Sequence, residues 1–315
     1  MHILIIGYSR IARRRVIPAI NAAAPESRIS VASRSAGPEG RGDEFTWYDD
    51  YADAVNRSGA DVAYISLPNA AHADWAQRAL SAGLHVIVDK PAFLTVCETV
   101  RILTQARASR RLIAEANVFP FHPQLETLTT LLSRHSVEGR RAVAVFSFPA
   151  LAASDFRHQR DLGGGALLDL GPYAVASDRV IFQSPPDRVH AEVVSRTPEG
   201  LVTGFSVLFS HGARGSLTGH FGFGTEYQNW LTVFGENLSV TLRRAFTTSL
   251  DAPALVDVQS GGALRGLEVP PADPFAVFLS AVFQAIQDNR LEAFAGSLGS
   301  DATLLERLGR ALAES

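Results

Sequence analysis

The sequence predicts an α/β protein of two domains: a doubly wound parallel sheet, then an α+β domain with a large, mostly antiparallel open sheet. In the first third of the chain, short apolar runs alternate with helical patterns, which is typical of a parallel sheet covered on both faces. After Phe119 and Pro120, long segments alternate apolar and polar residues, as in an antiparallel sheet with one covered face. The 315 residues are 46% hydrophobic, enough for two cores. We place the domains at residues 1–117 and 118–315.

The elements of the first domain follow from their local patterns. The apolar run His85–Val88 lies between Gly83, which ends a helix, and Pro91, so it is expected to be a buried strand. The same reasoning gives strands at Ile3–Ile6, Arg28–Ala32, Asp61–Ser66 and Leu112–Ala116. Helices are expected from the turn Gly7–Ala12 to about Ala23, and at Ala71–Ala82 and Cys97–Ala108.

In the second domain the period of the pattern changes from helical to alternating. Strands are expected at Ala142–Phe148, Arg188–Arg196, Val202–Ser210, Gly215–Phe221 and Trp230–Phe234, joined by turns rich in glycine and asparagine. Helices are expected at Gln124–Ser133, Gly164–Phe182, Pro274–Asp288 and Asp301–Ala313.

Composition excludes several classes of protein. The net charge is −3, which argues against a nucleic-acid partner. Cys97 is the only cysteine, so no intrachain disulfide forms, and no His, Asp and Glu set has the spacing of metal ligands. The run Ile3–Ile6 is too short for a signal sequence, and no segment approaches the ~20 apolar residues of a membrane span. We expect a cytoplasmic protein without a membrane or metal partner.

A glycine turn follows the first strand and opens the first helix. Gly7, Ser9 and Ala12 occupy the three positions of the dinucleotide fingerprint G-x-G-x-x-G/A, with serine in place of the second glycine. We expect Gly7, Ser9, Arg10 and Ile11 to hold a pyrophosphate on free backbone N–H groups, with the Ser9 hydroxyl as a further donor. The alternative is a purely structural turn.

The end of the second strand indicates which dinucleotide binds. An NAD site has an acidic residue here for the ribose hydroxyls, whereas this strand ends in Ser33 and Arg34. A hydroxyl and a guanidinium suit a 2′-phosphate, which favours NADP(H) over NAD(H). The alternative is that Arg34 is a solvated surface arginine.

Lys90 is the only lysine among 29 basic residues. An ammonium can lose its proton and acts as a compact charge, whereas a guanidinium stays protonated and needs a planar partner. Lys90 follows an apolar strand and precedes a proline, so a site that requires lysine is a better explanation than chance survival on a surface.

Two long motifs give the chain a resemblance to the Gfo/Idh/MocA family. Residues 79–91 read A-L-S-A-G-L-H-V-I-V-D-K-P, with Asp89 where the family has glutamate, and residues 163–173 read G-G-G-A-L-L-D-L-G-P-Y. Leu67, Pro68 and Asn69, with His72 three residues on, resemble the family's Pro-Asn turn. The resemblance implies a Rossmann domain, a nicotinamide cofactor, and a sugar-like substrate in a cleft between the domains.

The resemblance also assigns roles to residues. It makes Lys90, Asp169 and Tyr173 the catalytic and substrate-binding set, and adds Leu67, Pro68, Asn69, His72, Asp89 and Lys90 to the cofactor site. Tyr173 occupies a position that is histidine in many members. A tyrosine, with a reference pKa of about 10, is mostly an acid at neutral pH and suits carbonyl reduction, while histidine suits alcohol oxidation. The alternatives are a core tyrosine and a helix-terminal charge at Asp169.

Weaker candidates surround these motifs. Arg157, with His158, Arg160 and Asp161, precedes the triple glycine and could contact a sugar or a diphosphate, and Asn117 follows the last strand of the first domain. His122 precedes a proline, which favours a turn residue over a catalyst. The run 243–247, R-R-A-F-T, resembles a segment of members that act on nucleotide sugars; the alternative is a charged edge strand.

The sequence therefore predicts an NADP(H)-dependent oxidoreductase that interconverts a hydroxyl and a keto group on a sugar, with a nucleotide-linked keto-sugar as the preferred substrate class. The alternatives are an NAD-dependent polyol or inositol-type dehydrogenase and a non-catalytic dinucleotide-binding regulator on the same fold. Because an open sheet needs its outer face covered, we also expect a homodimer or homotetramer through the second domain.

Overall fold

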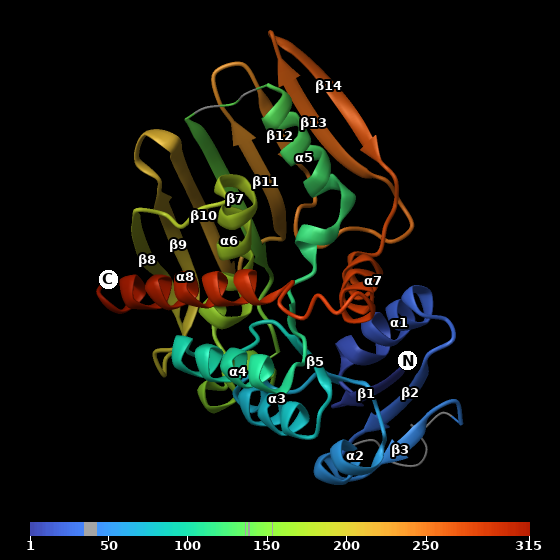
Figure 1. The fold of residues 1–315 in the computed structure, drawn as a ribbon. Coiled ribbons are helices and arrows are strands. Elements are labelled where there is room, and N and C mark those ends of the chain that lie inside the picture. Colours follow the sequence, from blue (N-terminus) through green and yellow to red (C-terminus); the bar gives the residue numbers. More distant parts are fainter. Residues whose placement is uncertain (35–42, 136, 138, 153) are drawn as a thin grey trace. The chain divides into compact units, whose positions relative to one another are not determined.

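A computed structural model describes residues 1–34, 43–135, 137, 139–152 and 154–315. The chain divides into two compact units (Figure 1). The first unit comprises Met1–Ala116 and Phe275–Ala302, and the second comprises Asn117–Pro274 and Thr303–Ser315.

The first unit is built on a parallel sheet in the order β3-β2-β1-β4-β5-β6. Its strands are β1 (His2–Ile6), β2 (Arg28–Ala32), β3 (Thr46–Tyr48), β4 (Val62–Ile65), β5 (His85–Asp89) and β6 (Ile113–Ala116). All five residues of β1 are buried, as expected for the centre of a sheet covered on both faces. The strand order reverses between β1 and β4, and doubly wound sheets bind ligands at the carboxyl ends of the strands at such a point.

Helices of the first unit begin and end where the sequence supplies caps. Thr95 and Glu98 form a capping box at the start of α4, and Asp50 accepts a hydrogen bond from the Asp53 N–H at the start of α2. The helices are η1 (Ala12–Val16), α1 (Ile17–Ala23), α2 (Tyr51–Arg57), η3 (Asn69–Ala71), α3 (His72–Ser81) and α4 (Val96–Ser109).

Residues 275–302, which the sequence placed in the second domain, belong to the first unit. They contain α7 (Pro274–Gln287) except its first residue, and the first part of α8 (Ala295–Ala313). Leu298 joins the apolar cluster of the first unit, and Arg107 of α4 pairs with Glu292 at 2.9 Å. The boundary between the two units therefore depends on which core the apolar faces of these helices join, and it does not fall at a single point in the chain.

The second unit contains an eight-stranded sheet in the order β14-β13-β12-β11-β7-β10-β9-β8. The neighbouring strands β7 and β10 are parallel and every other pair is antiparallel. The strands are β7 (Arg140–Phe148), β8 (Arg188–Arg196), β9 (Val202–Ser210), β10 (Gly215–Phe223), β11 (Gln228–Phe234), β12 (Ser239–Leu242), β13 (Ala254–Ser260) and β14 (Ala263–Val269). The predicted fold class is confirmed.

One face of this sheet is covered by helices. Alternate strand residues such as Ala144, Phe205 and Phe221 pack with Leu170 and Val175 into one apolar cluster. The helical segments are η4 (Phe119–Phe121), α5 (Pro123–Arg134), η5 (Phe156–His158), η6 (Arg160–Leu162), α6 (Ala166–Phe182) and η7 (Gly212–Arg214). Figure 1 shows α6 lying along the middle strands of the sheet. The core thus fixes α6, the helix that carries Asp169 and Tyr173.

Candidate active site

The parallel sheet of the first unit collects the cofactor candidates at one edge. The carboxyl ends of parallel strands share an edge, and the candidates follow β1 (Gly7, Ser9), β2 (Ser33, Arg34), β4 (Leu67) and β5. The sequence-predicted set, scattered over more than eighty positions of the chain, is therefore one local group of side chains.

The glycine turn has the geometry that a pyrophosphate-binding turn needs. Gly7 has a φ of +97°, and a Cβ on it would meet the Ser66 carbonyl oxygen at 2.3 Å and Leu67 Cδ2 at 2.7 Å. Only glycine fits there, because both the dihedral and the close backbone approach exclude a side chain. Ser9 Oγ accepts a hydrogen bond from the Ala12 N–H at 3.0 Å and so caps the first helix. The residues fit a dinucleotide cofactor.

The two residues at the end of β2 differ in exposure. Ser33 is 2% exposed, and its N–H donates to the Tyr48 carbonyl at 3.0 Å. Arg34 is exposed, and its guanidinium lies 4.6 Å from the ring centroid of Tyr51. Stacking on a ring holds the planar guanidinium in place and leaves its edge N–H groups for an anion. Of the pair, Arg34 is the residue that a 2′-phosphate can reach.

His72 holds the two family motifs of the first unit together. Its ring is fully buried, with Nδ1 2.9 Å from the Pro91 carbonyl oxygen and Nε2 2.8 Å from the Leu67 carbonyl oxygen. Asn69, in the intervening turn, is 8% exposed. His72 therefore shapes the backbone around Lys90 and Pro91, whose peptide bond is cis, rather than presenting its ring at the surface.

Asp89 and Lys90 stand at the carboxyl end of β5. Both oxygens of Asp89 accept hydrogen bonds from hydroxyls of the first unit, Oδ1 from Tyr64 and Oδ2 from Ser66, each at 2.6 Å. Burial raises the pKa of the Tyr64 hydroxyl well above its ordinary value, and the charge of Asp89 adds to this, so Tyr64 remains a donor. Lys90 is half-buried. The sequence motifs alone did not single out Tyr64.

In the second unit, the triple glycine turns the chain into α6. Gly163 and Gly165 have φ values of +76° and +102°, and the Gly165 N–H donates to the Arg157 carbonyl at 2.8 Å. A Cβ on Gly164 would meet the same carbonyl oxygen at 2.6 Å. The glycines thus allow the loop that carries Arg157 to fold back on the start of α6.

This loop brings Arg157 against Asp169. Arg157 Nε donates to Asp169 Oδ2 at 2.9 Å, and Nη1 lies 3.3 Å from Asp155 Oδ1. Burial acts to lower the pKa of Arg157, but Asp169 and then Asp155 outweigh it, so the pKa is raised and the guanidinium stays charged. The structure joins two residues that the sequence named separately, and the Arg157 cation fixes the orientation of the Asp169 carboxylate.

Tyr173 lies one turn after Asp169 on α6, as the helical spacing predicts. Its ring packs against three phenylalanines, with centroid distances of 4.9 Å to Phe146, 5.6 Å to Phe246 and 5.7 Å to Phe119. The side chain is only partly buried. The aromatic contacts therefore hold the ring while part of the residue stays accessible.

Asn117 and His122 are both buried, and each makes a hydrogen bond within the second unit. Asn117 is 5% exposed, and its Nδ2 donates to the carbonyl of Pro172, the residue before Tyr173, at 3.0 Å. His122 is 2% exposed and caps α5 by accepting from the Gln124 N–H. Burial lowers the pKa of His122. Asn117 thus acts on the predicted site through the backbone of α6.

The remaining sequence candidates lie in two groups. Arg160 and Asp161 are exposed residues of the loop before α6. Arg243 pairs with Asp257, and Arg244 lies 5.9 Å from the ring centroid of Tyr227. The preceding strand β12 is hydrogen-bonded on both sides, to β11 and β13, so the alternative of a charged edge strand is wrong.

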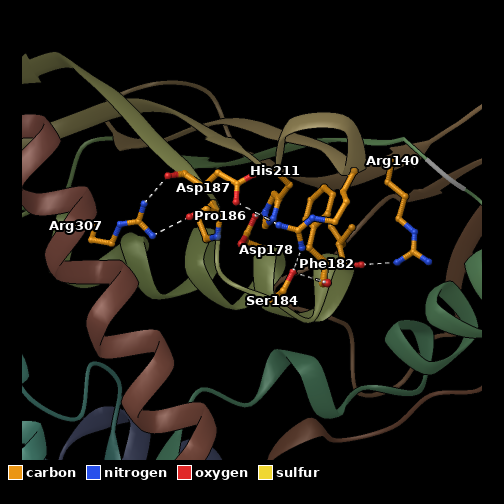
Figure 2. Close-up of polar contacts among 10 residues, drawn as sticks. Arg140, Asp178, Phe182, Ser184, Pro186, Asp187, His211 and Arg307 are labelled. Atoms are coloured by element: carbon orange, nitrogen blue, oxygen red, sulfur yellow. Dashed lines mark hydrogen bonds and ion pairs between the residues drawn. The ribbon is translucent and has the colours of Figure 1, made fainter.

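The carboxyl end of α6 is anchored by polar groups (Figure 2). His211 Nε2 lies 2.8 Å from Asp178 Oδ1 with both side chains buried, and the His211 ring stacks on Phe182 at 3.9 Å. Arg140 Nη1 donates to the Ile181 carbonyl at 2.6 Å. The charged guanidinium of Arg140 meets the negative end of the helix dipole, so the helix that carries Tyr173 is fixed at both ends.

The burial of His211 predicts an acid-labile stability. Burial, with help from the Arg214 guanidinium, lowers the pKa of His211 from 6.5 to about 4, against the opposing effect of Asp187. The unfolded chain then takes up a proton more readily than the folded one, so the free energy of unfolding falls as the pH drops through 6.5 and continues to fall until about 4.

Chemical denaturation of wild type and of His211→Asn across this pH range measures the effect. The variant should show a smaller loss of unfolding free energy on acidification. The exposed His135 provides the control, since His135→Asn should leave the pH dependence unchanged. An equal acid dependence in wild type and His211→Asn would contradict the assignment.

No helix in the described ranges is long and apolar enough to cross a bilayer, and those ranges contain no group of three or more His, Cys, Asp or Glu side chains placed for a metal ion.

A doubly wound sheet with a glycine turn at the β1–helix junction, followed by a separate α+β unit, defines a two-domain dinucleotide-binding protein.

Comparison with known proteins identifies the family. Residues 1–117 match the model "Oxidoreductase family, NAD-binding Rossmann fold", and residues 138–241 match the model "GFO/IDH/MocA C-terminal domain". The chain belongs to the Gfo/Idh/MocA family. A relative from Streptomyces violaceoruber is 30% identical over 295 residues, which cover 91% of this chain and 85% of that protein.

That relative is a dTDP-3,4-didehydro-2,6-dideoxy-alpha-D-glucose 3-reductase. An enzyme of the same name from Saccharopolyspora spinosa is 29% identical over 320 residues, covering 98% of this chain and 96% of the relative. Among solved structures, KijD10, a 3-ketoreductase from Actinomadura kijaniata in complex with NADP and TDP-benzene, superposes with a TM-score of 0.91 at 25% identity, over 99% of this chain and 98% of that one.

Proposed function

We propose that this chain is an NADPH-dependent reductase that acts on a keto group of a nucleotide-linked sugar. The observation that carries the proposal is the likeness of the full chain to KijD10, which was crystallised with NADP and a TDP compound. Two reductases of a dTDP-linked keto-sugar are similar over nearly the same length. The lone Lys90, the Arg157–Asp169 pair and Tyr173 support an enzyme over a dinucleotide-binding regulator, because a sensor has no use for this set.

In the proposed reaction, bound NADPH supplies a hydride to the carbonyl carbon. Lys90 places its ammonium charge where negative charge develops on the carbonyl oxygen. Tyr173 donates its hydroxyl proton to that oxygen, in the role that histidine has in many family members. Asp169, held by Arg157, orients the sugar, and the chain accordingly falls in the subset of the family with tyrosine at this position.

Turnover of defined substrates tests the function. The purified protein should oxidise NADPH with a nucleotide-linked 3-keto-sugar, and kcat/KM should fall at least about tenfold when the nucleotide is removed, because the diphosphate contacts are lost. Oxidation of polyols or inositols with NAD⁺ in place of this activity would establish the polyol dehydrogenase instead. Binding of NADPH without turnover of any carbonyl compound would establish the regulator.

The cofactor preference depends on Arg34. We expect NADPH to bind more tightly than NADH, and Arg34→Ala to weaken NADPH binding about tenfold or more while changing NADH binding little, since a charge-assisted hydrogen bond to the 2′-phosphate is lost. Fluorescence titration with both cofactors measures this. Arg78, an exposed arginine of α3 paired with Asp74, gives the matched control Arg78→Ala. Equal affinities for both cofactors in wild type would contradict the NADP assignment.

We also propose that the second unit associates with a second copy of the chain, as a homodimer or homotetramer. The sheet of the second unit carries a hollow of about 790 Å³, whose lining includes Val143, Val145, Leu208 and His220, with Ala311 at the end of α8. An open face of this kind is suited to burial against another protein surface. Light scattering should give a dimer or tetramer at micromolar concentration, and a monomer would contradict this proposal.

A further inference from the structure

One chain of hydrogen bonds connects two positions at which this sequence departs from the family pattern. Ser9 stands for the second glycine of the turn, and Asp89 stands for a glutamate. Ser9 Oγ lies 2.7 Å from Ser66 Oγ, and Ser66 Oγ donates to Asp89 Oδ2 at 2.6 Å. Tyr64 donates to the other oxygen of Asp89, also at 2.6 Å. The two departures are therefore parts of one structural feature.

Counting hydrogens gives the direction of each bond. Ser66 has one hydroxyl hydrogen, which it donates to Asp89, so its Oγ accepts the hydrogen of Ser9. Ser9 Oγ in turn accepts from the Ala12 N–H. The single hydroxyl hydrogen of Ser9 is thus used within the protein, and the phosphate donor role that the sequence suggested for it is filled instead by the backbone N–H groups at the start of the helix.

The register of the sheet explains why these side chains meet. Ile6 pairs with Ile65, and Ile65 pairs with Val88, so the residues that follow, Gly7, Ser66 and Asp89, lie level at the same edge. Tyr64, two residues before Ser66, shares its face of β4. Both Tyr64 and Ser66 are buried, at 0% and 3% exposure, so their hydroxyls need a partner inside the protein.

The length of the acidic side chain matters at this position. A glutamate would carry its carboxylate about 1.5 Å farther from the backbone, the length of one carbon–carbon bond. The hydrogen bonds to Asp89 are already at the short end of the normal range, so the longer side chain cannot keep both hydroxyl partners in place. Aspartate is the acid that fits this arrangement.

We infer that Ser9, Ser66 and Asp89 form one positioning unit, which ties the cofactor-binding turn to the end of the strand that carries Lys90. The inference rests on the proposed dinucleotide cofactor, because the turn acts in binding only if a pyrophosphate lies against it. Asp89 contributes through Ser66 and Ser9 rather than by contact with the cofactor. Serine in place of the second glycine and aspartate in place of the glutamate therefore depend on each other, because each keeps the other's hydrogen bonds in place.

A double-mutant cycle on NADPH affinity tests the unit, with the full-length protein and no sugar present. Ser9→Ala and Asp89→Glu should each raise the dissociation constant about tenfold, because each breaks the same chain of bonds. The double variant should also lose about tenfold, since residues that act together are not additive. Ser9→Thr keeps the hydroxyl and should restore affinity. A loss of about a hundredfold in the double variant, the product of the single effects, would overturn the inference.

Ser30 provides the matched control. Its hydroxyl is buried in the same sheet and lies 2.8 Å from His2 Nε2, and Ser30 pairs with Leu4, three residues before the turn begins at Gly7. Ser30→Ala should leave NADPH affinity unchanged, and its combination with Ser9→Ala should be additive. The free energy of unfolding of the unliganded variants gives a second cycle, in which Ser9 and Asp89 should again be coupled. The unfolding cycle tests the coupling of Ser9 and Asp89 even if wild type binds neither NADPH nor NADH. Such a lack of binding would overturn the proposed cofactor and not the positioning unit.

Discussion

Replacement of Lys90 by methionine should lower kcat for carbonyl reduction about a thousandfold. The ammonium is the charge proposed to stabilise the developing oxyanion, and removal of such a group typically costs 10²–10³ in kcat, about 2.7–4 kcal/mol. Methionine keeps the length and most of the volume of the side chain, which limits the change to charge and hydrogen bonding.

Steady-state kinetics and NADPH titration together measure this effect. The dissociation constant for NADPH should change much less than kcat, because the phosphate contacts are proposed to come from the turn after β1 and from Arg34. Lys90→Arg is the informative companion: it keeps a positive charge but spreads it over a planar group that stays protonated. We expect Lys90→Arg to remain strongly impaired. A value of kcat near wild type in Lys90→Met would exclude Lys90 from the chemistry.

The sequence predicted those parts of the site that follow strands of the parallel sheet. In such a sheet, each apolar run ends at the same edge, so a residue just after a run can be placed without knowing any side-chain contact. The candidates Gly7, Ser33 and Lys90 each follow such a run, and the predicted runs agree with β1, β2 and β5 to within a residue. The helical spacing of Asp169 and Tyr173 required only local geometry.

Contacts between distant segments could not be predicted in the same way. The Arg157–Asp169 pair depends on a loop that folds back through three glycines, and the bonds from Ser66 and Tyr64 to Asp89 depend on the register between β4 and β5. A correct register places Ser66 beside Asp89, so the pairing of these strands was the missing signal. In the sequence, Ser9 is only a departure from the glycine motif. In the structure, its hydroxyl is hydrogen-bonded to the hydroxyl of Ser66.

Several elements of the chain were also missed because they are short or lack strong periodicity. The strand Thr46–Tyr48 and helix Tyr51–Arg57 fall in this class, as does β12. The hairpin of β13 and β14 carried a usable signal, the pair Gly261-Gly262 between two alternating runs, which is typical of a tight turn. Residues 275–302 were assigned to the second domain because sequence order says nothing about which core an apolar helix face joins.

Replacement of Tyr173 by phenylalanine should lower kcat for carbonyl reduction by 10²–10⁴, the usual contribution of a general acid. The ring contacts to Phe119, Phe146 and Phe246 need no hydroxyl, so Tyr173→Phe should unfold at the same temperature as wild type within a few degrees. Stopped-flow or steady-state NADPH oxidation, beside a thermal melt, separates the two effects.

Ser177→Ala is the control for Tyr173→Phe, since it removes a hydroxyl from the same helix, bonded to the Tyr173 carbonyl, without removing the proposed acid. Tyr173→His tests the direction of the reaction. Histidine changes charge near neutral pH, so this variant should regain activity relative to Tyr173→Phe and should favour alcohol oxidation over reduction, compared with wild type, as the pH rises above about 6.5. A Tyr173→Phe variant with wild-type kcat would assign the proton to another group and reduce Tyr173 to a packing residue of the aromatic cluster.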